Sequence, residues 1–193
     1  MYEDLRKIHE NYHGNIVGLW GVASSGKDTI CSHLGMQRAA FADYLKALLE
    51  PVLSDKLGLD MDRYEDKAKA RELLVALGKL GRLVDPDFWI RSIDLPYRPR
   101  FGAMDYEDVC LTDIRYFNEM LWAHQKGGII IEVKRPGHGF ANDEERKSFE
   151  EIYRLAPEYG INIKQVLNDG SPSQVASEVR ELLREHWSEG KAA

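Results

Sequence analysis

Apolar residues gather in continuous runs along this chain of 193 residues, and each run predicts a buried strand. The first run covers residues 15–21 without alternating polar positions, which is typical of a strand covered on both faces. A turn bounded by glycines follows it, and residues 28–35 then have the composition of a helix. Further strands are predicted over residues 38–42, 108–113, 128–134 and 163–167.

The segments between these runs carry apolar residues at helical spacing. Residues 43–83 hold two such stripes, one around Leu45 and one around Leu73, with a connector over residues 58–65. Strands that alternate with helices predict a three-layer α/β fold, in which helices cover both faces of a parallel sheet. The remaining helices are predicted over residues 116–126, 143–154 and 173–187.

Length, charge and cysteine content indicate which kinds of protein this chain can be. The length and an apolar content of 44% suffice for one globular domain with a continuous core. A net charge of −6 gives no broad basic surface for a nucleic acid, although a small anionic ligand remains compatible. Two cysteines are too few for a disulfide framework or a Cys-based zinc site, so we expect reduced, buried thiols. We also expect a cytoplasmic protein, since no segment resembles a secretory signal or a membrane span.

The turn after the first strand has the form of a phosphate-binding loop, GVASSGKDT, which begins at Gly21. Gly21 and Gly26 permit a tight turn, the backbone N–H groups face an anion, and Lys27 reaches the terminal phosphates of ATP. One position departs from the usual pattern, because Asp28 stands where Ser or Thr normally faces Mg²⁺. The sequence leaves open whether Asp28 binds the metal directly, binds it through water or orients the acceptor, with Thr29 supplying the hydroxyl.

A second polar group follows the strand predicted over residues 108–113. Ligands bind at the carboxyl edge of an open parallel sheet, so Asp113 is expected to face the same edge as the loop and to position Mg²⁺ or its waters. Arg115 carries a fork of donors that suits a phosphate. Glu119 lies one helical turn further on and is expected to orient Arg115 or to contact the acceptor. The structural alternatives are a helix cap for Asp113 and a surface ion pair between Arg115 and Glu119.

With these motifs and several others, the chain resembles the deoxynucleoside monophosphate kinases of the bacteriophage type. The resemblance extends from about residue 16 to about residue 179, and its most specific parts are the Lys-Asp-Thr loop and the block TDIRYFNE that begins at Thr112. The other matching elements are Phe41-Ala-Asp43 with Lys46, Arg71 with Gly78 and Gly81-Arg82, Asp85 to Ile90, Gly128 to Pro136, and Asn168 to Ser171.

The resemblance implies transfer of the γ-phosphoryl group of ATP to a deoxynucleoside 5′-monophosphate, with Mg²⁺ as cofactor. The acceptor's deoxyribose rests on this resemblance alone. The residues implied in ATP binding are Gly21, Ser24, Ser25, Gly26, Lys27, Asp28 and Thr29. The residues implied in catalysis are Ser25, Lys27, Asp28 and Arg115. Those implied in acceptor binding are Asp43, Lys46, Arg71, Trp89, Asp113, Arg115 and Glu119, and those implied in metal binding are Asp28, Thr29 and Asp113.

Several of these residues also have a plain structural interpretation. Trp89 would stack on the base, yet packing in the core is its alternative. Asp43 would equally serve as the N-cap of the helix that carries Leu45. Arg71 would otherwise be one charge on a solvated helix face.

The resemblance also implies a single P-loop NTPase domain over residues 1–193. Its core is expected at about residues 15–35, 106–135 and 160–187, with a helical acceptor-binding insertion at about 43–95 and a lid at about 135–155. The expected partners are small nucleotides, with neither nucleic acid nor membrane. A homodimer is compatible with the sequence, although no feature demonstrates one. The candidates for a lid arginine over ATP are Arg135 and Arg146.

Two other functions fit part of the pattern. The Lys-Asp loop would also serve a kinase of another small phosphorylated acceptor, of the phosphomevalonate or dephospho-coenzyme A type. Trp89 and the block that begins at Thr112 suit a nucleotide better than either of these. Asp28 in the Mg²⁺ position would also suit a nucleotide-binding module without catalysis.

Overall fold

The computed structural model describes residues 5–60, 64–95, 97–100 and 103–189. The chain forms two compact units: unit 1 comprises Met1–Ala39 and Leu95–Ala193, and unit 2 comprises Ala40–Asp94. Unit 2 has nearly the extent of the helical insertion expected at about residues 43–95. Its role in acceptor binding, like that of the lid, stays a prediction.

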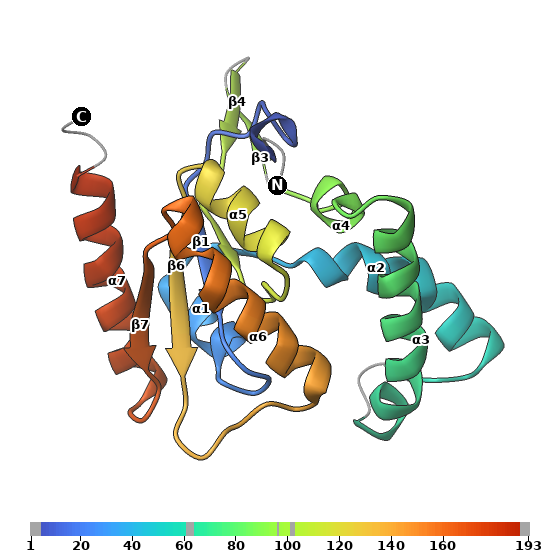
Figure 1. Ribbon diagram of the computed structural model, residues 1–193. Helices are drawn as coiled ribbons and strands as arrows, with labels where there is room; N and C mark the ends of the chain where they lie inside the picture. The colour runs from blue at the N-terminus through green and yellow to red at the C-terminus, as the bar shows by residue number, and fades with distance from the viewer. Residues whose placement is uncertain (1–4, 61–63, 96, 101–102, 190–193) are drawn as a thin grey trace. The chain divides into compact units, whose positions relative to one another are not determined.

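Unit 1 contains a parallel sheet of five strands. The strands are β1 (Ile16–Trp20), β2 (Gln37–Ala39), β5 (Val109–Leu111), β6 (Ile129–Lys134) and β7 (Ile163–Leu167). They lie in the order β2-β5-β1-β6-β7, which makes β1 the central strand (Figure 1). Val17 of β1 lies opposite Cys110 on one side and Ile129 on the other. All five residues of β1 are buried, as its unbroken apolar run predicts.

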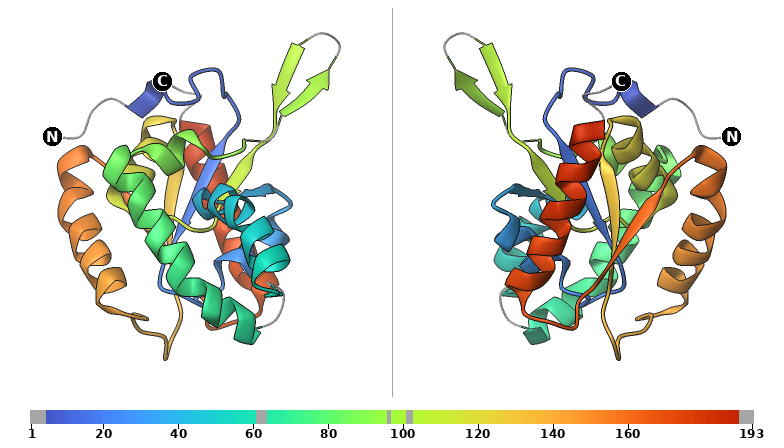
Figure 2. Two further views of the ribbon diagram at one scale, coloured as in Figure 1. Left: turned by 90° about the vertical axis from the view of Figure 1, so that its right-hand side faces the viewer. Right: turned by 90° about the vertical axis from the view of Figure 1, so that its left-hand side faces the viewer.

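Helices cover both faces of this sheet. They are α1 (Lys27–Leu34), α5 (Phe117–Gln125), α6 (Asp143–Leu155) and α7 (Pro172–Glu189), with the short 3-10 helices η1 (Leu5–Lys7) and η3 (Pro157–Tyr159). α1 packs beside α7 on one face, and α5 packs beside α6 on the other (Figures 1 and 2). Ile129 and Ile131 of β6 share a core cluster with Ile30 of α1 and Val179 of α7. The predicted three-layer α/β fold is therefore confirmed.

Unit 1 also contains a hairpin where no strand was expected. β3 (Tyr97–Arg100) and β4 (Ala103–Tyr106) pair in antiparallel fashion, with Tyr97 opposite Tyr106. This segment carries Pro99 and charged residues instead of a continuous apolar run, so it lacks the pattern by which the other strands were recognised. The second strand is also shorter than the predicted 38–42, because a helix already begins at Phe41.

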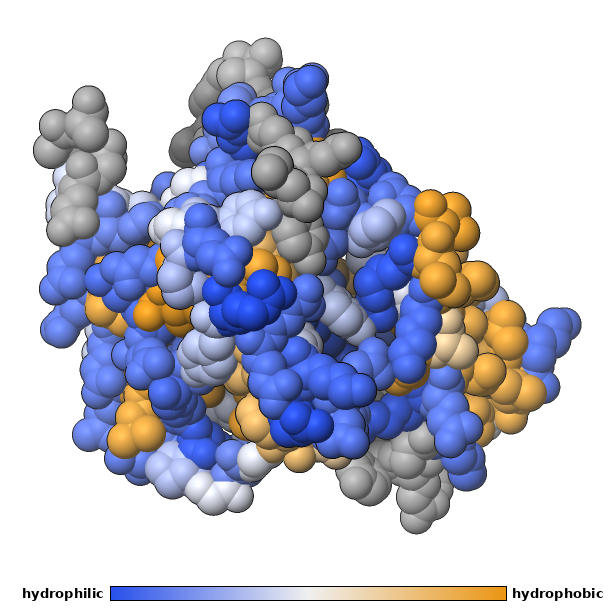
Figure 3. Space-filling view, viewed as in Figure 1, coloured by the Kyte–Doolittle hydropathy of each residue, from blue (hydrophilic) through white to orange (hydrophobic). Residues whose placement is uncertain are grey.

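Unit 2 is helical, as its periodicity predicts. Its elements are α2 (Phe41–Pro51), the π-helical turn η2 (Val52–Lys56), α3 (Tyr64–Val84) and α4 (Phe88–Arg91). The N-cap of α2 is Ala40, so Asp43 lies in the first turn and the alternative of an Asp43 cap is wrong. Large apolar side chains are exposed on α3, at Leu80, Leu83 and Val84, and Figure 3 shows apolar surface gathered over α2 and α3. A homodimer remains an expectation.

Two further expectations concern the cysteines and the membrane. Cys31 in α1 and Cys110 in β5 are free and buried, as expected. Among the described residues, no helix is both long and apolar enough to cross a membrane.

Candidate active site

The loop between β1 and α1 adopts the glycine-dependent turn that its sequence predicts. Gly21 has a φ of 149° and Gly26, the N-cap of α1, has a φ of 98°. A Cβ atom would lie 2.5 Å from the carbonyl oxygen of Val133 at the first position and 2.3 Å from Nδ2 of Asn168 at the second. Both glycines are thus required by conformation and by space.

Side chains from neighbouring segments hold the backbone of this loop. Asn168, which follows β7, donates Nδ2 to the carbonyl oxygen of Ser25 at 2.7 Å. Arg135, which follows β6, donates Nη1 to the carbonyl oxygen of Ser24 at 3.0 Å. Oε1 of Glu145, in the first turn of α6, accepts the N–H of Ala23 at 2.9 Å. The N–H group of Ala23 therefore donates to a carboxylate oxygen, and oxygens of anions are the atoms that such a loop binds.

Lys27 lies at the start of α1 and turns its ammonium group back onto the loop. Nζ donates to the carbonyl oxygens of Gly21 at 2.8 Å and Val22 at 2.9 Å, and to Oγ of Ser25 at 3.3 Å. Burial lowers the pKa of Lys27, and the nearby carboxylates, chiefly Asp28, oppose this shift.

The charges that act on Lys27 identify which predicted residues come together. Besides Asp28, the carboxylates of Glu145 and Asp113 raise its pKa, and the guanidinium of Arg115 lowers it. These residues lie far apart in sequence and belong to the loop, to the segment after β5 and to α6. The structure thus brings Lys27, Asp28, Asp113 and Arg115 into one charged region of unit 1, at the carboxyl edge of the sheet.

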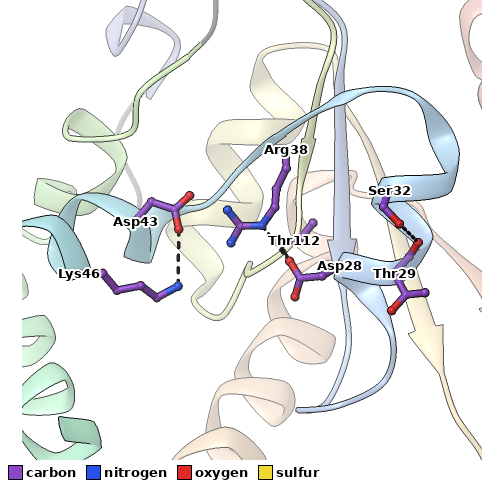
Figure 4. A network of polar contacts seen from close by, with 7 residues as sticks. All are labelled: Asp28, Thr29, Ser32, Arg38, Asp43, Lys46 and Thr112. Atoms are coloured by element: carbon purple, nitrogen blue, oxygen red, sulfur yellow. Dashed lines mark hydrogen bonds and ion pairs between the residues drawn. The ribbon is translucent and has the colours of Figure 1, made fainter. Parts of the chain in front are cut away.

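Asp28, the irregular residue of the loop, is held by two donors (Figure 4). Its Oδ1 accepts Nε of Arg38 at 2.9 Å and the hydroxyl of Thr112 at 2.7 Å. Burial alone would raise the pKa of Asp28, but these two hydrogen bonds and the charges of Arg38 and Lys27 outweigh it and lower the pKa. Asp28 is therefore ionised at neutral pH.

The loop that follows β5 is fixed by Glu119 and by α6. Glu119 is buried, and its Oε2 accepts the backbone N–H groups of Arg115 at 2.7 Å and Tyr116 at 3.0 Å. The hydroxyl of Ser148 donates to the carbonyl oxygen of Arg115, and the hydroxyl of Tyr116 donates to Glu144 at 3.0 Å. Glu119 thus orients the backbone at Arg115 by capping α5, a role that differs from the surface ion pair with Arg115 that the sequence offered as its structural alternative.

The oxygen donors of this region fit Mg²⁺ together with nucleotide phosphates. Asp28 and Asp113 supply carboxylate oxygens, a ligand type that Mg²⁺ prefers, whereas the recorded contacts of Thr29 are those of its carbonyl oxygen with Ser32 and His33. The bonds from Arg38 and Thr112 to Asp28 both fall on Oδ1. No group of three or more His, Cys, Asp or Glu within the described ranges is arranged as a metal cage. A bound Mg²⁺ would accordingly share its coordination with substrate phosphates and water.

Four predicted acceptor residues belong to unit 2. Asp43 and Lys46 form an ion pair of 3.5 Å along α2 (Figure 4), and Arg71 is exposed on α3. Trp89 is only 4% exposed, and its Nε1 donates to the carbonyl oxygen of Gly78 at 2.9 Å.

The surroundings of Trp89 explain its burial. A Cβ atom on Gly81 would lie 2.7 Å from the indole ring, so this glycine of α3 makes room for it. We therefore correct the expectation of a base-stacking platform, because the indole is packed inside unit 2.

Sequence reasoning missed Arg38, the role of Thr112 toward Asp28, and the contacts of Asn168 and Glu145 with the loop. Arg38 carried a usable signal, because it lies in a short parallel strand and therefore near the carboxyl edge of the sheet. Glu145 carried none, since an acidic residue in the first turn of a helix is common for its favourable interaction with the helix dipole.

Comparisons with known proteins give distant similarities. No family model matches the chain. The chain is 29% identical over 126 residues to an uncharacterized protein, ORF76, of Ictalurid herpesvirus 1 (strain Auburn). The aligned residues make up 65% of this chain and 50% of that protein. The chain therefore spans about half the length of this curated relative.

Two solved kinases are similar in structure. The Mycobacterium tuberculosis APS kinase CysC, in complex with AMPPNP and APS, has a TM-score of 0.40 at 17% identity, covering 90% of this chain and 99% of the other. An unliganded sugar kinase from Janibacter sp. HTCC2649 has a TM-score of 0.45 at 14% identity, covering 89% and 95%.

Proposed function

We propose that this chain transfers the γ-phosphoryl group of ATP to a deoxynucleoside 5′-monophosphate and releases ADP and the corresponding diphosphate. The observation that carries the proposal is the charged region around the glycine loop. There Lys27, Asp28, Asp113 and Arg115 lie at the carboxyl edge of the sheet, and the backbone turn has no room for side chains at Gly21 and Gly26. Such a region suits two phosphate groups that must be held in line and neutralised.

The reaction requires little covalent work from the protein. An oxygen of the acceptor phosphate attacks the γ-phosphorus, the bond from that phosphorus to the β–γ bridging oxygen breaks, and ADP leaves with the electron pair. The acceptor phosphate is already nucleophilic, so no general base is needed. Lys27 exchanges its bonds to the loop carbonyls for phosphate oxygens, and the exposed Arg115 offers its fork to the transferring group. In related P-loop systems one such arginine is worth about 10³–10⁵ in rate.

Asp28, Thr29 and Asp113 are the residues that would hold Mg²⁺ in this region. The metal would supply positive charge to the phosphates. Ser25 of the loop is fully buried, and its Oγ lies 3.3 Å from Nζ of Lys27, so it positions the lysine.

The choice of acceptor rests on the resemblance to the bacteriophage-type kinases and on the unit 2 residues Asp43, Lys46 and Arg71. Trp89 no longer supports it, since its ring is packed. A panel of acceptors tests this choice directly. We expect ADP release, followed in a coupled assay with ATP and Mg²⁺, for at least one of the four common deoxynucleoside monophosphates.

The same panel distinguishes the alternatives. Turnover with phosphomevalonate or dephospho-coenzyme A, and with none of the nucleotides, would replace this function by the other kinase function. ATP binding without turnover of any acceptor would instead identify a nucleotide-binding module.

Replacing Lys27 by alanine tests the role of the loop. The variant Lys27→Ala should keep its far-UV circular dichroism and lose transfer by at least about a hundredfold, since the cation on the transferring phosphates is gone. Lys7→Ala is the matched control, because Lys7 is an exposed lysine of η1 in the same unit. Near wild-type activity of Lys27→Ala would contradict the proposed role of the loop.

A further inference from the structure

Glu145 of α6 places a carboxylate directly on the glycine loop. It lies in the first turn of the helix and is half-buried. Its Oε1 accepts the N–H of Ala23 at 2.9 Å, and its Oε2 accepts the N–H of Ala141 at 2.6 Å. One carboxylate therefore joins the loop to the segment that precedes α6.

The segment between β6 and α6 contacts the loop from both of its ends. Arg135, which follows β6, donates to the carbonyl oxygen of Ser24, and Glu145, at the other end, accepts the N–H of Ala23. The segment thus meets two consecutive loop residues, with a cation on a carbonyl oxygen and an anion on an N–H group. A phosphate on the loop would attract Arg135 and repel Glu145.

α6 presents Glu145 from a fixed position. Phe149 and Ile152 of this helix are buried, and the hydroxyl of Tyr153 donates at 2.6 Å to Oε1 of Glu132, a buried residue of β6. The later turns of α6 are thereby attached to the sheet. A change of side-chain rotamer at Glu145 is then enough to free the N–H of Ala23.

The carboxylate of Glu145 lies where a nucleotide would bring its own negative charge. The backbone N–H groups of such a loop bind phosphate oxygens, and the lysine of the loop reaches the terminal phosphates of ATP. Burial lowers the pKa of Lys27, and the charge of Glu145 is among those that oppose this shift. Glu145 thus acts on the same lysine, and two anions so close to one cation and one N–H group repel each other.

We propose that Glu145 holds the place of a phosphate oxygen of ATP on the empty loop and must withdraw when ATP binds. The contact between Glu145 and Ala23 is thus autoinhibitory, and Glu145 sets the affinity of the loop for ATP. The proposal rests on the ATP binding that the proposed function includes. Only molecules in which Glu145 has withdrawn are ready to bind, so the apparent Kd for ATP is divided by the fraction of such molecules.

The variant Glu145→Gln tests the proposal, because it removes the charge and keeps the size of the side chain. Calorimetry with Mg²⁺ and AMPPNP, a non-hydrolysable ATP analogue, measures Kd. We expect Kd to fall by about three- to tenfold relative to wild type, the range in which one such hydrogen bond shifts an equilibrium. Raising the salt concentration from about 0.05 M to about 0.5 M should reduce this difference, since salt screens repulsion between exposed charges.

Two further variants complete the test. Glu145→Ala removes both acceptor oxygens and should also bind AMPPNP more tightly than wild type, with an unchanged far-UV circular dichroism spectrum. Glu185→Gln is the matched control, because Glu185 is an exposed carboxylate near the C-terminal end of α7 in the same unit. Its Kd should stay within about twofold of wild type.

The outcomes separate this inference from the proposed function. An unchanged Kd in Glu145→Gln overturns the inference, and a raised Kd also does so, because Glu145 would then shape the loop for ATP. A wild type that binds AMPPNP and transfers to no nucleoside monophosphate removes the proposed acceptor and leaves the role of Glu145 standing. A wild type that does not bind AMPPNP removes both.

Discussion

Replacing Gly26 by alanine separates the backbone cost of a left-handed residue from the cost of crowding the phosphate loop. Gly26 and Gly35 cap the two ends of α1, with φ values of 98° and 75°. A Cβ atom at Gly35 meets nothing within 4 Å, whereas at Gly26 it lies 2.3 Å from Nδ2 of Asn168. The two variants therefore share the conformational strain and differ in the contact with Asn168.

The conformational strain and the contact with Asn168 give the expected loss of stability in each variant. A left-handed conformation costs a residue with a Cβ roughly 1–2 kcal/mol, so Gly35→Ala should lower the free energy of unfolding by about that amount. In Gly26→Ala the amide of Asn168 must also move and give up its bond of 2.7 Å to the carbonyl oxygen of Ser25. This loss adds about 1 kcal/mol, for a total of roughly 2–3 kcal/mol.

Urea denaturation followed by circular dichroism measures the stability of both variants, and calorimetry measures their affinity for an ATP analogue. Gly26→Ala should be the less stable of the two and should lose most of its ATP binding, because the backbone N–H groups of the loop are displaced. Gly35→Ala should bind within about twofold of wild type, since its Cβ points into open space. Equal destabilisation by both substitutions, or wild-type ATP affinity in Gly26→Ala, would refute the role of Gly26 in shaping the loop.

Two further predictions concern Trp89 and Asp28. Trp89→Phe removes the indole donor to the carbonyl oxygen of Gly78 and should lower the free energy of unfolding by about 1–3 kcal/mol. The acceptor KM should stay unchanged. A large rise in KM at wild-type stability would restore the stacking role. The folded-state pKa of Asp28 is lowered, so its contribution to stability is present above the unfolded-state pKa of about 3.9 and is lost as the pH falls through the folded-state value. Urea denaturation should show a difference in the free energy of unfolding between wild type and Asp28→Asn that is constant from about pH 5 to 8 and shrinks below about pH 4. A change in this difference near neutral pH would contradict the lowered pKa of Asp28.

The glycine loop could be predicted because its requirements are local. Gly21 and Gly26 have positive φ values that their positions in the motif imply, and Lys27 follows at once in the sequence. The strands of the sheet could be predicted for a similar reason, since full burial requires continuous apolar runs. The hairpin β3–β4 was missed because its segment carries no such run.

The contacts of Asp28 could not be predicted, because they join residues that are distant in sequence. The hydroxyl of Thr112 lies 84 positions from Asp28, and Arg38 reaches it from another strand. The carboxylate of Glu145 contacts the loop across an interval of 122 residues. Each of these pairings depends on strand order, and no local pattern encodes which strand becomes a neighbour.

Trp89 and Glu119 show the same limit for single residues. Their types are compatible with binding a nucleotide, and equally with packing or capping. The room that Gly81 leaves on α3 and the bond from the indole to the carbonyl oxygen of Gly78 showed that Trp89 is packed. The backbone around Arg115 showed that Glu119 caps α5.

The sequence by itself determined the fold class, the position of the glycine loop and the presence of Lys27 on it, because periodicity and backbone conformation are local properties of a chain. The tertiary structure decided which charges surround Lys27, which residues hold Asp28, and that Trp89 is packed. These depend on burial and on the proximity of distant segments, and both are consequences of how the strands and helices assemble.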